Sequence, residues 1–124
     1  MAPGVTAVDP GLLADVATGL WRARGKLVDP ASGEPLPAGR GAHRHVQRTL
    51  EVLARAGVEV VDHQGADFVA GVVLDVVAFQ PVPGLTREVV IEVVRPSVYV
   101  GGVLVQRGEV IVGTPVADGS GATA

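Results

Sequence analysis

This chain of 124 residues contains no cysteine, so it has no disulfide framework, no thiolate nucleophile and no cysteine-based metal site. The absence of cysteine fits a reducing compartment. Aromatic residues are nearly as scarce: the sequence holds one tryptophan, one tyrosine and two phenylalanines. Hydrophobic residues still make up 48% of the chain. We therefore expect one small domain, or one domain with an appendage, whose core consists of valine, leucine and alanine.

Long apolar runs are also missing. No stretch reaches the roughly 18 residues that a membrane-spanning helix needs, and the start of the chain, MAPGVTAVDP, lacks the basic segment of a signal peptide. We therefore expect a cytoplasmic protein without a membrane partner.

The net charge is −3, with seven Arg/Lys against five Asp/Glu in residues 1–56 and three against eight in residues 57–124. This balance argues against a nucleic-acid partner.

No combination of residues typical of an active site is present. The sequence contains neither a G-x-S-x-G motif nor a phosphate-binding G-x-x-x-x-G-K-[ST] loop, and its single lysine, Lys26, has no such context. His43 and His45 form a His-x-His pair that would suit a metal ion in a loop or strand. On a helix, however, histidines two residues apart do not share a face. We therefore predict no metal, no cofactor and no enzymatic activity.

Acidic residues on the predicted strands leave one alternative to a non-enzymatic protein. Asp75, Glu88 and Glu92 would supply an acid–base pair if two of them converged. Alternation along a strand places such residues on a solvent-exposed face without any catalytic role. A small enzyme is therefore the least favoured hypothesis, and turnover that is lost on changing His43 or Asp75 would support it.

Two amphipathic helices are predicted in the first half of the chain. Asp9 is a typical N-cap, the following proline suits the first helical position, and apolar residues recur at helical spacing over residues 10–24. Residues 28–41 are rich in proline and glycine and predict a loop. A second helix is predicted over residues 42–56, with Gly57 placed to end it in the left-handed conformation.

The apolar stripe of the second helix is narrow, which indicates packing against another helix, including one from a second copy of the chain. We therefore expect a homodimer formed through the helices. The apolar positions expected at its interface are Leu13, Val16, Leu20, Val46, Leu50 and Leu53.

The second half of the chain changes to strand-like patterns. Short valine-rich runs bounded by turn residues predict a compact all-β unit. The predicted strands are residues 58–61, 72–79, 89–94, 98–100, 103–105 and 110–112. Residues 81–84, with two prolines and a glycine, are predicted to break the second strand. Gly101 and Gly102 are predicted to form a type I′ hairpin turn, because both central residues of that turn need positive φ.

Three segments resemble a known family. Residues 50–62, LEVLARAGVEVVD, close a helix with a glycine and run into a strand, and a G-x-x-F segment follows at residues 65–68. Residues 89–112, VVIEVVRPSVYVGGVLVQRGEVIV, are similar to the pattern V-x-E-V-x-R-P-G-Y-x-x-G-G-x-x-x-R-P-A-x-V-x-V. Together they resemble the β-domain of the GrpE family, nucleotide exchange factors for DnaK-type (Hsp70) chaperones. The first helix is similar to the shorter bundle helix of that family.

The resemblance implies a function without chemistry. A GrpE β-domain binds one lobe of the chaperone's ATPase domain and favours its open form, from which ADP leaves. The resemblance implies that the partner-binding residues are Phe68, Arg95, Gly102, Val103, Arg107 and Val112. Phe68 and Val112 are equally explained as core residues of a valine-rich unit, and this alternative stays open.

Several positions depart from the family pattern. The long N-terminal helix that pairs with a second copy has no counterpart, and the usual F-D-P-x-x-H-E-A is replaced by FVAGVVLD at residues 68–75. The usual Gly-Tyr becomes Ser97-Val98. The alternative is therefore a degenerate, GrpE-derived protein-binding or scaffold module without exchange activity.

These observations predict an α+β protein in which two bundle-forming helices precede a small all-β domain of short strands. Residues 1–57 would form the helical and dimerising region, with its loop at residues 28–41. Residues 58–115 would form the β-domain, and residues 116–124 a disordered tail.

Overall fold

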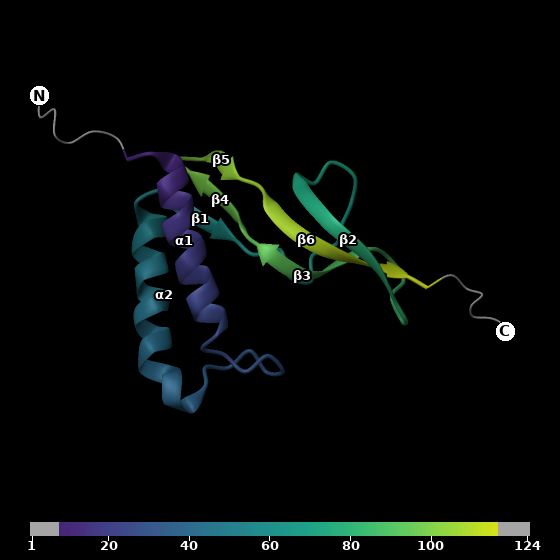
Figure 1. Cartoon of the computed structure of the whole chain (residues 1–124), viewed down its shortest axis with the longest axis horizontal. Helices are drawn as coiled ribbons and strands as arrows, with labels where there is room; N and C mark the ends of the chain where they lie inside the picture. Colours follow the sequence, from purple (N-terminus) through teal and green to yellow (C-terminus); the bar gives the residue numbers. More distant parts are fainter. Residues whose placement is uncertain (1–7, 117–124) are drawn as a thin grey trace, which may run out of the picture. The chain divides into compact units, whose positions relative to one another are not determined.

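The computed structural model describes residues 8–116, so the expected tail lies outside the described residues from residue 117 onward. Within that range the chain forms two α-helices, one 3-10 helix and six β-strands in two three-stranded sheets (Figure 1). The predicted α+β class is confirmed. No helix in this part of the chain is both long enough and apolar enough to cross a membrane.

The described residues divide into two compact units. Unit 1 comprises residues 8–61 and 98–106, and unit 2 comprises residues 62–97 and 107–116. This division differs from the expected boundary after residue 57, because one of the two sheets belongs with the helices. Helices and strands are therefore mixed in unit 1, whereas unit 2 is a sheet with its covering loop.

Helix α1 (Pro10–Gly25) begins as the sequence predicts. The carboxylate of Asp9 accepts a hydrogen bond from the backbone N–H of Gly11 at 3.0 Å, and Pro10 occupies the first turn. The side chain thus satisfies a backbone donor that the helix cannot pair, while proline gives up no helical hydrogen bond there. The predicted helix is confirmed to within one residue at its end.

The segment between the helices contains a tight turn. The Asp29 N–H donates to the Glu34 carbonyl at 2.8 Å, and the Gly33 N–H donates to the Asp29 carbonyl at 2.7 Å. A short 3-10 helix, η1 (Pro37–Gly39), leads into helix α2 (Arg40–Arg55). The second helix therefore begins two residues before its predicted start and ends one residue earlier than predicted.

Three short strands form the first sheet. In sheet order they are β1 (Val58–Val61), β4 (Ser97–Val100) and β5 (Val103–Gln106). Strands β4 and β5 are antiparallel, and the glycines that join them, Gly101 and Gly102, have φ of 59° and 82°. The predicted hairpin is confirmed, and positive φ at both positions is what a type I′ turn requires. Gly57 has φ 93°, as predicted for the residue that ends α2.

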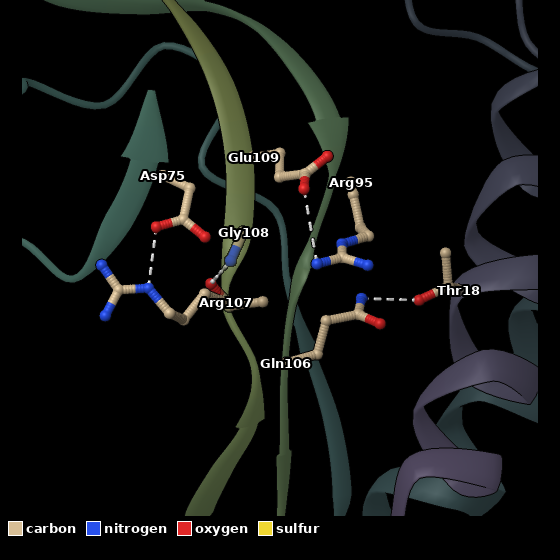
Figure 2. A network of polar contacts seen from close by, with 8 residues as sticks. Thr18, Asp75, Arg95, Gln106, Arg107, Gly108 and Glu109 are labelled. Atoms are coloured by element: carbon tan, nitrogen blue, oxygen red, sulfur yellow. Dashed lines mark hydrogen bonds and ion pairs between the residues drawn. The ribbon is translucent and has the colours of Figure 1, made fainter. Parts of the chain in front are cut away.

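The core of unit 1 forms between the small residues of α1 and the valines of the first sheet. Its buried members are Ala14, Ala17, Val58 and Val98. Gln106 Nε2 donates to Thr18 Oγ1 at 2.8 Å, which joins β5 to α1 (Figure 2). Small residues on α1 allow the helix to approach the sheet closely, so unit 1 packs as helices on a sheet.

This packing changes the reading of the residues expected at a dimer interface. Leu13 and Leu53 pack on the core of unit 1, and Leu50 is only 8% exposed. Leu50 is therefore an interior position of a single chain, and Leu13 and Leu53 are half-buried against the core, because β1 follows α2 directly and supplies an apolar surface. Val16 is 54% exposed, whereas Leu20 and Val46 are half-buried. The homodimer itself stays a prediction.

Three longer strands form the sheet of unit 2. In sheet order they are β2 (Leu74–Val82), β6 (Gly108–Pro115) and β3 (Val89–Arg95). The central strand β6 is parallel to β2 and antiparallel to β3. The prediction that residues 81–84 break the second strand is wrong for Pro81 and Val82, which continue β2. Proline fits there because β2 has only one neighbouring strand, so a missing N–H need not interrupt a ladder.

The outer edge of β3 is covered by the chain that precedes β2. The Phe68 N–H donates to the Glu88 carbonyl, and the Val90 N–H donates to the Ala66 carbonyl, each at 2.9 Å. The buried core of unit 2 consists of Leu74, Val90, Val110 and Val112. The edge of β2 that faces away from β6 has no strand beside it in the described sheet.

Candidate protein-binding surfaces

Two ion pairs lie on the sheet of unit 2 (Figure 2). Arg107 Nε donates to Asp75 Oδ1 at 2.9 Å, and Arg95 Nη2 lies 3.5 Å from Glu109 Oε2. The strand register places Asp75 opposite Glu109 and Glu109 opposite Arg95, alternating with core residues such as Val110. The charged groups therefore occupy the face opposite the core. All four side chains are roughly one-third to one-half exposed, so each pair contributes at most about 1 kcal/mol to stability.

Arg95 and Arg107, both expected to bind a partner, are thus already engaged by acids of their own unit. Arg95 also has a buried Nε without a hydrogen-bond partner, and its side chain is 38% exposed against 52% for Arg107. A partner carboxylate would have to share or replace Glu109 or Asp75. Both arginines are accessible, but each already pairs with a carboxylate of its own unit. Exchanging that carboxylate for one of a partner would therefore add little free energy to binding.

Gly102 and Val103 lie at the tip of the β4–β5 hairpin in unit 1. The Val103 side chain is 64% exposed, the highest value among the large exposed apolar residues of the described chain. An exposed valine beside a two-residue turn is suited to contact a partner, because a valine side chain has few rotamers to lose when it is buried.

Phe68 and Val112 are core residues. Phe68 is half-buried, packs on the core of unit 2, and meets Phe79 edge to face with ring centroids 6.2 Å apart. Val112 is 0% exposed. The expectation that the Val112 side chain contacts a partner is therefore corrected: alternation along β6 turns it inward between the other core valines.

The six expected binding residues thus fall into two groups. Gly102 and Val103 belong to unit 1, and the other four belong to unit 2. The structure brings Arg95 and Arg107 onto one charged face of a sheet and places Phe68 and Val112 in the core behind that face.

A group of exposed apolar residues in unit 2 was missed by the sequence interpretation. It lies on β2 and on the chain just before it, and its members are Val69, Val73, Val77 and Phe79, with exposed fractions of 58%, 49%, 53% and 57%. Val77 is exposed where the register of β2 shifts between Val76 and Ala78. The break in alternation within the valine run and the nearby prolines were the available signals of such an edge strand.

One histidine of unit 2 contacts a buried serine, and the two other histidines lie on α2. His63 Nε2 lies 2.9 Å from Ser97 Oγ, and that oxygen also accepts a hydrogen bond from the Gly108 N–H at 3.0 Å. Ser97 is 2% exposed, so no substrate reaches its hydroxyl in this conformation. His43 and His45 lie on α2, and among residues 8–116 no three His, Cys, Asp or Glu side chains are grouped to hold a metal ion.

Unit 1 contains an open cavity of about 260 Å³ between the helices and β1. Arg24, Gln47 and Glu59 contribute polar atoms to it, and Leu50 lies among its apolar residues. Arg24 Nη1 donates to Gln47 Oε1 at 2.7 Å, so the guanidinium is partly used within the unit. The volume lies below the range of roughly 300–1,000 Å³ typical of small-molecule sites.

Comparison with protein-family models and with curated proteins finds no match to this chain.

Proposed function

We propose that this protein is a GrpE-like co-chaperone that binds the ATPase domain of an Hsp70-type chaperone and promotes the release of ADP. The observation that carries the proposal is the run of motifs in residues 50–112. Along that run, α2 ends at Arg55, Gly57 follows with positive φ, and the Gly101–Gly102 pair forms a tight hairpin, in the order that the resemblance implies. A cytoplasmic location and a homodimer are part of the same proposal.

The proposed mechanism is a shift between two conformations of the chaperone. The protein accelerates ADP release only if it binds the open form of the ATPase domain more tightly than the closed form. No group of this chain needs to touch the nucleotide or carry out chemistry. Exposed and rigidly held residues are sufficient, and Val103 at the hairpin tip is the clearest example.

The alternative is a protein-binding or scaffold module without exchange activity. The exposed apolar residues Val69, Val73, Val77 and Phe79 favour a protein partner in either case, because exposed apolar groups of this kind mark interaction surfaces. Substitution of the family's F-D-P-x-x-H-E-A segment favours the alternative. The two hypotheses differ in whether binding to the ATPase domain changes the rate of ADP release.

Stopped-flow release of a fluorescent ADP analogue from a DnaK-type chaperone of the same organism tests the proposal. We expect the release rate to rise with the concentration of this protein and to saturate. Val103→Asp should remove most of the acceleration, because it places a charge at the proposed contact. Val116→Asp is the matched control, since Val116 is 45% exposed and outside every proposed contact. Equal rates with and without the folded wild-type protein would reject exchange activity and leave the alternative.

A further inference from the structure

Four arginines line one exposed face of helix α2, and none of them belongs to the binding residues proposed above. We call this face the arginine stripe and define it by Arg40, Arg44, Arg48 and Arg55. At 3.6 residues per turn these positions fall within an arc of about 80° and extend along about 22 Å of the helix axis. All four residues are exposed, on the side of α2 away from the buried Leu50.

None of the four stripe arginines forms an ion pair among the described residues. No hydrogen bond or ion pair joins any of its four guanidinium groups to another side chain of residues 8–116. The arginines of unit 2 behave differently, because Arg87, Arg95 and Arg107 each pair with a carboxylate. At Arg87, the hydrogen bond that the guanidinium donates to Asp67, and then the charge of that carboxylate, raise the pKa of the guanidinium.

Helix α2 contains a single acid, Glu51. Glu51 Oε2 accepts a hydrogen bond from Gln47 Nε2 at 3.1 Å, and Gln47 Oε1 accepts one from Arg24 at 2.7 Å. This hydrogen bond holds one oxygen of the Glu51 carboxylate, which keeps its charge on the same face, three residues after Arg48 and four before Arg55, without an ion pair to either. Like charges one helical turn apart repel each other, so α2 retains an arrangement that disfavours the helix in isolation.

Three classes of anionic partner differ in how well they fit this surface. An acidic protein segment would gain exposed ion pairs, which are weak, and Val52, which is 48% exposed, is the single large apolar residue beside the stripe that it could cover. Stable binding of a helix to an anionic membrane adds insertion of its apolar face to the electrostatic attraction, but Leu50 is buried and Leu53 packs on the core of unit 1. A nucleic-acid backbone needs only a line of cations, because binding is driven by the release of condensed counterions.

We propose that the arginine stripe binds the phosphate backbone of duplex nucleic acid without reading base sequence. Arginine forks match phosphate geometry, and successive stripe residues Arg40, Arg44 and Arg48 recur about every 6 Å along the helix. Helix α2 contains no Phe, Tyr or Trp for stacking on unpaired bases, which favours a duplex over a single strand. The charge of the two halves of the chain argued against a nucleic-acid partner. That average does not show that four arginines of the first half align on one face of α2.

The test is fluorescence anisotropy of a fluorescein-labelled 20-base-pair DNA duplex of mixed sequence, titrated with the full chain between 50 and 200 mM NaCl. If four phosphates are neutralised, the slope of log K against log [salt] is about −3.6, which is a loss of roughly 150-fold over that range. Arg44→Gln/Arg48→Gln should reduce the slope to about −1.8. Changing the base sequence of the duplex should leave the affinity unaltered.

Arg87→Gln is the matched control, because it removes one positive charge from unit 2 and should leave the slope unchanged. Circular dichroism should show the same helix content in all variants, since the substituted side chains are exposed. Absence of binding at 50 mM NaCl, or equal slopes for the wild type and the double variant, would overturn the proposal. Stripe-dependent binding of labelled poly-glutamate or of anionic phosphatidylserine vesicles, without binding of the duplex, would overturn it as well and assign the stripe to that partner.

Discussion

The burial of Val112 gives a prediction whose size can be worked out. Its side chain is 0% exposed and lies in the core with Leu74, Val90 and Val110. Val112→Ala removes two carbon atoms, which at about 0.8 kcal/mol each costs roughly 1.6 kcal/mol of transfer free energy. The cavity left in the core adds to this value, because close-packed neighbours relax only in part. We expect the free energy of unfolding to fall by roughly 2–3 kcal/mol.

Val103 is the residue to compare with Val112. Both were expected to bind the same partner, and Val103 is 64% exposed whereas Val112 is buried. Val103→Ala should change the free energy of unfolding by less than about 0.5 kcal/mol. Urea titrations followed by circular dichroism measure both changes, and unaltered slopes against urea would show that the unfolded states are comparable. In the ADP-release assay, Val103→Ala should weaken acceleration, whereas Val112→Ala should retain it once its folded fraction is taken into account.

The reasoning would be refuted if Val112→Ala unfolded at the same urea concentration as the wild type. It would also be refuted if the two variants were equally destabilised, since exposure would then have no bearing on the cost. A stable Val112→Ala protein without exchange activity would instead restore Val112 as a contact residue.

Three further substitutions test particular features of the fold, each by its urea midpoint. Gly102→Ala should destabilise the protein by about 1 kcal/mol, because its φ of 82° disfavours a side chain. Val103→Ala is the control for a substitution at this place in the hairpin. An unchanged urea midpoint for Gly102→Ala would contradict the turn geometry. Ser97→Ala should cost about 1–3 kcal/mol by leaving the buried Gly108 N–H without its acceptor; a neutral result would mean that water replaces the hydroxyl. Gly113→Ala should cost about 1–3 kcal/mol, because a Cβ there would lie 2.7 Å from Ile91 Cγ2; a gain in stability would show that Ile91 moves aside freely.

Local chemistry allowed the helices and the hairpin to be predicted. The Asp9 cap, the glycine after α2 and the paired glycines of the hairpin each act within a few residues, so their effect can be read without knowing the fold. The partition of strands between the two units could not be predicted in the same way. Strand β1 joins a sheet with β4, which begins 36 residues after β1 ends, and no local pattern specifies that pairing.

The candidate surfaces were predicted in part. Exposure of Val103 follows from its position beside a tight turn, but burial of Val112 depends on which face of β6 the other strands cover. The exposed residues of β2 were missed because a valine run does not by itself show which of its side chains the rest of the unit covers. The arginine stripe was available from helical periodicity alone, and summing charge over half of the chain hid it.

The route of the chain limits how this protein can be dissected. It passes between the two units three times, at residues 61–62, 97–98 and 106–107. A fragment that starts at residue 58 would contain all six strands but none of the helix surface that buries Val58 and Val98. A fragment that ends at residue 57 would leave Ala14 and Ala17 without their sheet. Neither piece is a domain in isolation, so loss of function on truncation would report misfolding, and point substitutions at exposed positions are the appropriate means of mapping each surface.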